Sequence, residues 1–341
     1  MGTPTESRMT SAELAQAYYV TQARRQRQTG DRVQALWNQL DRRDLTWSWE
    51  SMVGPEIVRT VVLGQAAAAS GSDEYVAAVA AAEGGQVAPA GRVLVSGFAG
   101  RAADGRPLDS LLYLPVITTK EAIGAGLDET EAMLRGLTQL LKMAASEVAD
   151  AGRQATGVSI TASRTINGYI RVVNPPACAR CIILAGKEFG WNAGFQRHPR
   201  CDCVHMPARL IKRGRHHPRV FDSAAYFRSL SAAEQDRLFT IAGAQAIRDG
   251  ASVSSVVNAR RGMYTTTAYG RRVAATREGT TRRGAFYRSE RAEAIARGRI
   301  PASGRGFRLR APRLLPEEIY ELSAGNRDEA IRMLRRFGYI G

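Results

Sequence analysis

The chain has 341 residues, of which 44% are hydrophobic and 23% are charged. This length predicts two or three folded units, and the composition excludes wholesale disorder. No stretch approaches the roughly 20 apolar residues of a membrane-spanning helix, and residues 1–15 lack the basic start and apolar run of a signal peptide. We therefore expect a soluble protein that is made in a cytoplasm and has no membrane partner.

The formal net charge of +16 indicates a polyanion or an acidic protein as partner. The excess is local. Residues 251–313 contain 15 arginines and only three acidic residues, so this segment carries 15 − 3 = 12 of the 16 net charges. An arginine-rich segment in the last third of the chain is therefore the place to look for such a partner.

The first half of the chain has helical periodicity. Thr10 or Ser11 can cap a first helix, with Glu13 in its first turn, that continues towards Asp44. The next helices are expected at residues 47–69, 73–82, 108–123 and 128–153, separated by glycine- and proline-rich breaks. This part of the chain is predicted to be a helical domain over residues 1–154.

After Gly157 the pattern becomes alternating. Strands are expected at residues 158–161 and 168–173, and short ones at 189–195 and 201–206. We expect a small α+β module over residues 155–215, too short to have a large hydrophobic core.

The last region, residues 216–341, opens on a capping box, Ser231 with Glu234, and the helix that follows should end at Asp249-Gly250. Residues 262–310 have few large apolar side chains and are expected to form an extended, arginine-rich arm. Terminal helices are expected at 316–322 and 326–337. The predicted fold class is thus mainly α and multi-domain, with a small zinc-binding α+β module and an extended C-terminal arm.

All four cysteines lie within the 26 residues from Cys178 to Cys203. In a reducing cytoplasm such clustering favours a metal over disulfides, and zinc takes four thiolate or imidazole ligands in a tetrahedron. The spacing of Cys178 and Cys181 lets both sulfurs reach one ion. We expect these two ligands and two of His198, Cys201 and Cys203 to bind a structural Zn²⁺, with His205 a weaker candidate.

Two other interpretations of the cysteines remain open. They could be buried, metal-free thiols, or the zinc could be catalytic, with Glu188 or Asp202 as general base. A structural ion is favoured because metal binding supplies folding free energy that a segment with so few apolar residues lacks.

The same run resembles the phage Mu F-like minor head proteins, which act in head morphogenesis of tailed phages. The resemblance is carried by Asn174-Pro175-Pro176-x-Cys178-x-x-Cys181, Leu184-Ala185-Gly186-Lys187, Trp191-Asn192-Ala193-Gly194-Phe195 and His198-Pro199-Arg200-Cys201-Asp202-Cys203. It extends to other segments, among them Phe98-Ala99-Gly100, Leu111-Leu112-Tyr113, Ala242–Gly250, Val257–Met263 and Gly279–Gly284. The cysteine run is the specific part.

The resemblance implies a low-copy virion protein inside the head, near the portal, that helps procapsid assembly. Its implied partners are the portal and major capsid proteins and packaged double-stranded DNA. Relatives are often labelled capsid maturation proteases, which is the alternative function. The residues do not support that label, because a serine protease needs a nucleophile, a base and an oxyanion hole, and Ser96-Gly97 is not a nucleophile elbow. No catalytic residue is predicted.

The arginine-rich segment supplies the candidate DNA contacts. Forked guanidinium groups suit phosphate, and neutralised phosphates release counterions, which makes such binding salt-dependent and indifferent to sequence. The candidates are the paired arginines Arg260, Arg261, Arg271, Arg272, Arg282 and Arg283. The alternative is a solvated basic face without a partner. Aromatic residues among the arginines, Tyr264, Tyr269, Phe286 and Tyr287, could stack on bases or pack in a core.

Overall fold

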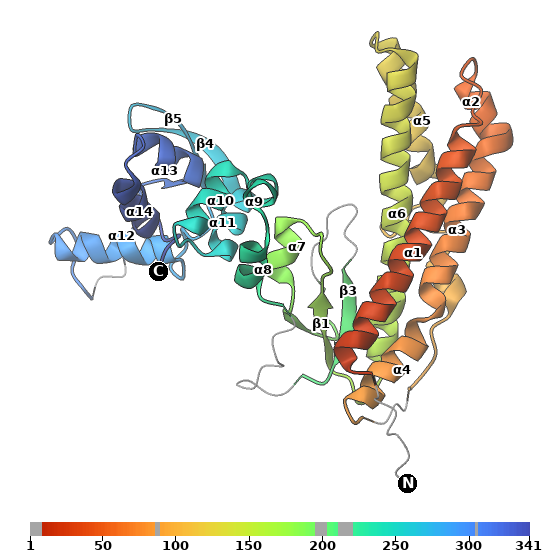
Figure 1. Cartoon of the computed structure of the whole chain (residues 1–341), viewed down its shortest axis with the longest axis horizontal. Coiled ribbons are helices and arrows are strands. Elements are labelled where there is room, and N and C mark those ends of the chain that lie inside the picture. The colour runs from red at the N-terminus through yellow and green to blue at the C-terminus, as the bar shows by residue number, and fades with distance from the viewer. Residues whose placement is uncertain (1–8, 86–88, 195–202, 211–220, 304–305) are drawn as a thin grey trace. The chain divides into compact units, whose positions relative to one another are not determined.

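The computed structural model describes residues 9–85, 89–194, 203–210, 221–303 and 306–341. The chain is mainly helical and divides into two units (Figure 1). The first unit consists of residues 1–175 and 185–221, and the second of residues 176–184 and 222–341. The short segment that carries Cys178 and Cys181 thus belongs to the second unit. Within the described residues, no helix is long and apolar enough to cross a membrane.

Long helices dominate the first unit, and in Figure 1 four of them, α1, α3, α5 and α6, run alongside one another. The helices of this unit are α1 (Ser11–Trp37), α2 (Leu45–Ser48), the π-helical turn η1 (Trp49–Val53), α3 (Gly54–Ser70), α4 (Ser72–Ala82), the 3₁₀ turn η2 (Val95–Phe98), α5 (Leu108–Gly124) and α6 (Glu129–Ala162). The predicted cap at Thr10 is confirmed, and it forms a capping box: the Thr10 side chain accepts the Glu13 N–H, and the Glu13 carboxylate accepts the Thr10 N–H. The helical interpretation of residues 10–153 is therefore confirmed, although α1 ends at Trp37 rather than near Asp44.

Apolar stripes of these helices form one core. Its buried side chains include Trp37, Ile57, Leu112, Leu140 and Val148. Full burial of each such side chain stabilises the fold by about 1.5–3 kcal/mol. Packing against this core, rather than helix propensity alone, keeps the long helices aligned.

Three short strands complete the first unit. They are β1 (Gly168–Val172), β2 (Glu188–Gly190) and β3 (Val204–Ala208), in the antiparallel order β2-β1-β3. Gly168 pairs with Gly190 on one side and with Ala208 on the other. Strand β3 contacts α1 and α4, and apolar residues from all three elements share a second core.

The predicted strand at residues 158–161 is wrong, because α6 continues to Ala162. Ile160 and Ser159 are buried while Val158 is exposed, so the buried positions follow the helical stripe that already contains Val148 and Ala155. An established helix adds residues at little cost, and this cooperativity outweighs the local β-propensity of Val158 and Ile160.

The second unit combines short helices with a three-stranded sheet of antiparallel order β4-β5-β6. Its elements are α7 (Ala179–Leu184), α8 (Ser223–Ser229), α9 (Ala232–Phe239), α10 (Ile241–Arg248), α11 (Val253–Ala259), the 3₁₀ turn η3 (Arg260–Gly262), β4 (Met263–Ala268), β5 (Arg271–Thr276), α12 (Ala285–Ala296), β6 (Arg313–Leu314), α13 (Pro316–Leu322) and α14 (Arg327–Arg336). The two predicted terminal helices, α13 and α14, are confirmed.

The predicted extended arm over residues 262–310 is wrong. This segment forms the hairpin β4–β5 and helix α12. Tyr269 and Gly270 both have positive φ, 53° and 75°, as a tight two-residue hairpin turn requires. The segment has few large apolar residues, but two of them, Val273 and Phe286, are buried in the core of the second unit. Residues from α13 and α14 complete their packing there.

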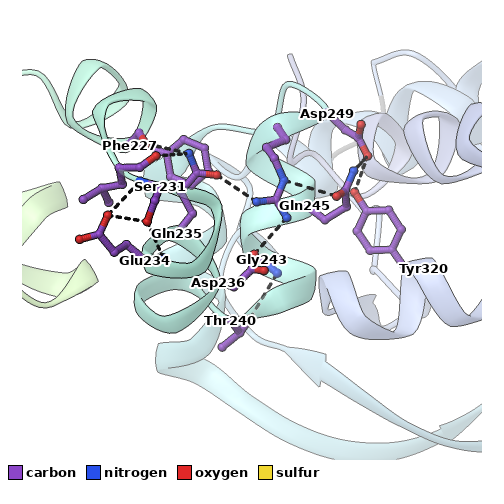
Figure 2. A network of polar contacts seen from close by, with 12 residues as sticks. Phe227, Ser231, Glu234, Gln235, Asp236, Thr240, Gly243, Gln245, Asp249 and Tyr320 are labelled. Atoms are coloured by element: carbon purple, nitrogen blue, oxygen red, sulfur yellow. Dashed lines mark hydrogen bonds and ion pairs between the residues drawn. The ribbon is translucent and has the colours of Figure 1, made fainter.

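The single helix predicted to end at Gly250 is instead α9 and α10, separated at Thr240. This residue has φ 68° and ψ 157°, and its hydroxyl caps α10 by accepting the Gly243 N–H. Polar side chains bridge the two helices, and Figure 2 shows this network. The Arg248 guanidinium donates to Gln235 at 2.9 Å and to Asp236 at 3.0 Å.

Candidate functional site

The first cysteine pair forms a tight turn at the start of α7. Cys178 is half-buried and Cys181 is buried. The backbone N–H of Cys181 donates to Cys178 Sγ at 3.4 Å, and the Ile182 N–H donates to the Cys178 carbonyl at 3.1 Å. An N–H group directed at sulfur stabilises a thiolate, which is the form of cysteine that ligates zinc. The geometry of this turn therefore fits a metal-binding cysteine pair.

Cys203 belongs to the first unit and is fully buried immediately before β3. Its carbonyl accepts a hydrogen bond from Arg153 Nη1 at 3.3 Å, and Arg153 also pairs with Asp150 at 2.8 Å. Two residues on, the His205 ring stacks on Tyr169 with the ring centres 4.1 Å apart, and its carbonyl accepts the Tyr75 hydroxyl at 3.0 Å. Helix α6 and the sheet thus fix the backbone around Cys203.

Two predicted zinc ligands, His198 and Cys201, lie outside the described residues. Among the residues that are described, no group of three or more His, Cys, Asp or Glu side chains is placed to hold a metal ion. Only three of the five candidate ligands, Cys178, Cys181 and Cys203, are among the described residues, so the structural zinc stays a prediction. Asp202, the possible base of a catalytic zinc, also lies outside the described residues, and Glu188 lies in β2.

Two of the predicted DNA-contacting arginines are engaged by acidic residues of α13. Arg260 forms an ion pair with Glu317 and donates to the Thr240 hydroxyl at 2.8 Å. Arg271 pairs with Glu318 at 2.8 Å and with Glu321 at 2.9 Å. Burial lowers the pKa of the Arg260 guanidinium, an effect that Tyr339 opposes. Arg271 thus joins α13 to the hairpin, and Arg260 joins α13 to the turn η3.

The other four predicted arginines, Arg261, Arg272, Arg282 and Arg283, are exposed. The aromatic residues between them differ: Tyr269 is exposed at the hairpin turn, whereas Phe286 and Tyr287 are buried, so these two have the packing role.

An open groove of about 540 Å³ in the second unit collects further arginines. Arg277, Arg282, Arg308 and Arg310 line it. Only Arg282 among these four belongs to the arginine pairs that were predicted from the sequence; Arg277, Arg308 and Arg310 do not. The signal available was the alternation in Phe307-Arg308-Leu309-Arg310, where Leu309 packs against the core and both arginines are exposed.

The protease alternative gains no geometric support in the described residues. Ser96 lies in the 3₁₀ turn η2, which does not connect a strand to a helix. Of the four histidines, only His205 is described, and its ring lies against Tyr169.

No protein-family model, curated protein or solved structure matches this chain.

Proposed function

We propose that the chain is a minor structural protein of a tailed-phage head that acts near the portal during head assembly and contacts packaged DNA. The observation that carries the proposal is the cysteine run that begins at Asn174. Its residues resemble those of Mu F-like head proteins, and its described part contains a turn in which the Cys181 N–H faces Cys178 Sγ. The role proposed is structural rather than enzymatic.

In this proposal Cys178, Cys181 and two of His198, Cys201 and Cys203 hold one zinc ion. Zinc supplies folding free energy and no chemical step, because four protein ligands leave no open position for a substrate or water.

The basic second unit supports the DNA part of the proposal. Its groove arginines offer forked donors suited to phosphate.

Co-assembly tests the proposed function. The chain is co-expressed with the portal and major capsid proteins of the same phage, and sedimented particles are analysed by mass spectrometry. We expect the chain in a few copies per particle when the portal is present and its loss when the portal is omitted. If the chain never sediments with particles, the proposal is wrong.

The same particles test the protease alternative. A structural role predicts a full-length capsid subunit, whereas a shortened subunit that appears only with this chain would favour the protease.

A further inference from the structure

The groove of the second unit is built from the hairpin β4–β5 with the residues that follow it, and from residues 307–312. Strand β4 contributes Tyr264, the end of β5 leads to Arg277, and residues 307–312 form the opposite wall. The Arg277 guanidinium lies over the Tyr264 ring at 5.5 Å from its centre, and the Arg277 N–H donates to the Gly262 carbonyl at 3.0 Å. One wall of the groove is therefore fixed by the hairpin.

The opposite wall is fixed by α12. The buried Tyr287 hydroxyl donates to the Phe307 carbonyl at 2.9 Å, and the two rings meet edge to face at 5.2 Å. Leu309 packs against the core, which leaves Arg308 and Arg310 exposed on the groove side of the segment. The arginines are thus carried by ordered backbone.

The charge of the groove is of one sign. Among the described residues that line it none is acidic, and its four arginines form no ion pair with another described residue. Arg260 and Arg271 in the same unit, by contrast, are neutralised by carboxylates of α13. Like charges gathered without counter-charges favour an anionic ligand, and the lining threonines Thr266 and Thr281 add neutral hydroxyl donors.

The aromatic side chains of the groove distinguish between kinds of nucleic acid. Tyr264 is covered by Arg277, Tyr287 is buried, and Phe307 packs on Tyr287. Bases of a single strand bind by stacking on exposed rings, whereas Tyr264 and Phe307 are half-buried and Tyr287 is buried. A duplex, whose bases are already stacked, needs only contacts to its phosphates.

We infer that this groove binds the phosphate backbone of double-stranded DNA without sequence preference, through Arg277, Arg282, Arg308 and Arg310. The inference rests on the DNA contact in the proposed function and moves it from the paired arginines to the groove.

Salt-dependent binding by the full-length chain tests the inference. Fluorescence anisotropy is measured with a labelled 20-base-pair duplex between 50 and 200 mM KCl. With four phosphate contacts, the logarithm of the binding constant should fall with the logarithm of salt concentration with a slope of about −3.6, or about −0.9 per contact. The variant Arg308→Ala with Arg310→Ala should bind roughly tenfold more weakly per arginine and lose about 1.8 of the slope.

The matched control is Arg228→Ala with Arg335→Ala. These arginines are exposed in the second unit outside the groove, so the control loses the same charge and should keep the wild-type slope to within about one contact. A second groove variant, Arg308→Gln with Arg310→Gln, removes the same two charges but keeps side-chain bulk. It replaces the alanine variant if that variant folds poorly, and it should lose the same affinity and the same part of the salt slope.

The outcomes separate this inference from the function on which it rests. Duplex binding that is lost in the groove variants and kept in the control supports the groove. Duplex binding that is unchanged in the groove variants, or lost equally in the control, overturns the groove and leaves the DNA contact standing. Tighter binding of a 20-nucleotide single strand than of the duplex overturns the duplex assignment. Absence of salt-dependent binding by the wild type overturns both the groove and the DNA contact, whereas co-assembly with particles is judged separately.

Discussion

The guanidinium carbon of Arg313 lies 4.1 Å from the centre of the Tyr339 ring, inside the second unit. Arg313 is 3% exposed and donates to three backbone carbonyls, those of Phe337 at 2.7 Å, Glu278 at 2.8 Å and Gly338 at 3.3 Å. Arg313→Ala leaves these carbonyls without their donor and opens a cavity. We expect the free energy of unfolding of the second unit to fall by about 3 kcal/mol or more, measured by urea denaturation.

Tyr339→Phe perturbs the same contact and should cost less stability than Arg313→Ala. It keeps the ring beneath Arg313 and removes only the hydroxyl, which donates to the Leu314 carbonyl at 2.9 Å. The expected loss is about 1 kcal/mol. Equal stability of wild type and Arg313→Ala would show that the buried arginine does not hold the C-terminal segment.

The ionisation of the Asp249 carboxyl should make the stability of the second unit depend on pH. Burial alone would raise its pKa, but hydrogen bonds from Tyr320, Gln245 and Arg327 outweigh burial and hold the pKa below its usual value. Figure 2 shows Asp249 beside Gln245 and Tyr320. A carboxyl with a lowered folded-state pKa stabilises the fold above the unfolded-state pKa of about 3.9, and this stabilisation is lost as the pH falls through the folded-state pKa. We therefore expect stability to decrease below about pH 4.

The variant Asp249→Asn measures the contribution of this carboxyl. At pH 7 it should be less stable than wild type by about 1–3 kcal/mol, since charge-assisted hydrogen bonds to Tyr320 and Arg327 are lost. The difference should shrink as the pH falls below about 4, because the carboxyl of the unfolded state is then protonated and the stabilisation of the charged form in the folded state is progressively lost. A difference that stays constant from pH 7 to pH 3, by urea midpoint, would contradict this role.

Gly136 fixes the crossing of α5 and α6. A Cβ atom there would overlap Thr119 Oγ1 and lie 2.9 Å from the Trp37 ring. Gly136→Ala should destabilise the first unit by about 1–3 kcal/mol through overpacking. Gly157→Ala in the same helix is the control, because nothing lies within 4 Å of its added Cβ. The control should gain up to about 1 kcal/mol from helix propensity, and destabilisation of both variants alike would contradict the packing argument.

The parts of the fold that the sequence predicts are those encoded locally. Capping boxes at Thr10 and Ser231 mark helix starts because the hydrogen bonds involved span three residues. The hairpin β4–β5 was missed since its turn residues, Tyr269 and Gly270, are not a typical pair for positive φ, and because its core partners come from α13 and α14. Distant packing cannot be inferred from a local scarcity of apolar residues.

The same distinction applies to the candidate site. Clustered cysteines are visible in the sequence, and so is the surplus of arginine. The sequence does not show which arginines are available to bind an anion, because Glu317 and Glu318, more than 40 residues further along the chain, neutralise Arg260 and Arg271. The alternation of apolar residues and arginines at residues 307–310 identifies the exposed arginines only once it is known that Leu309 packs against the core.

Metal analysis of the purified full-length chain tests the central claim most directly, namely that its cysteine run holds a structural zinc ion. We predict one zinc per chain, its loss in Cys178→Ala with Cys181→Ala, and a lowered melting temperature of the wild type in chelator. A wild-type protein that contains no zinc, and whose melting temperature neither chelator nor the double substitution changes, would contradict the account.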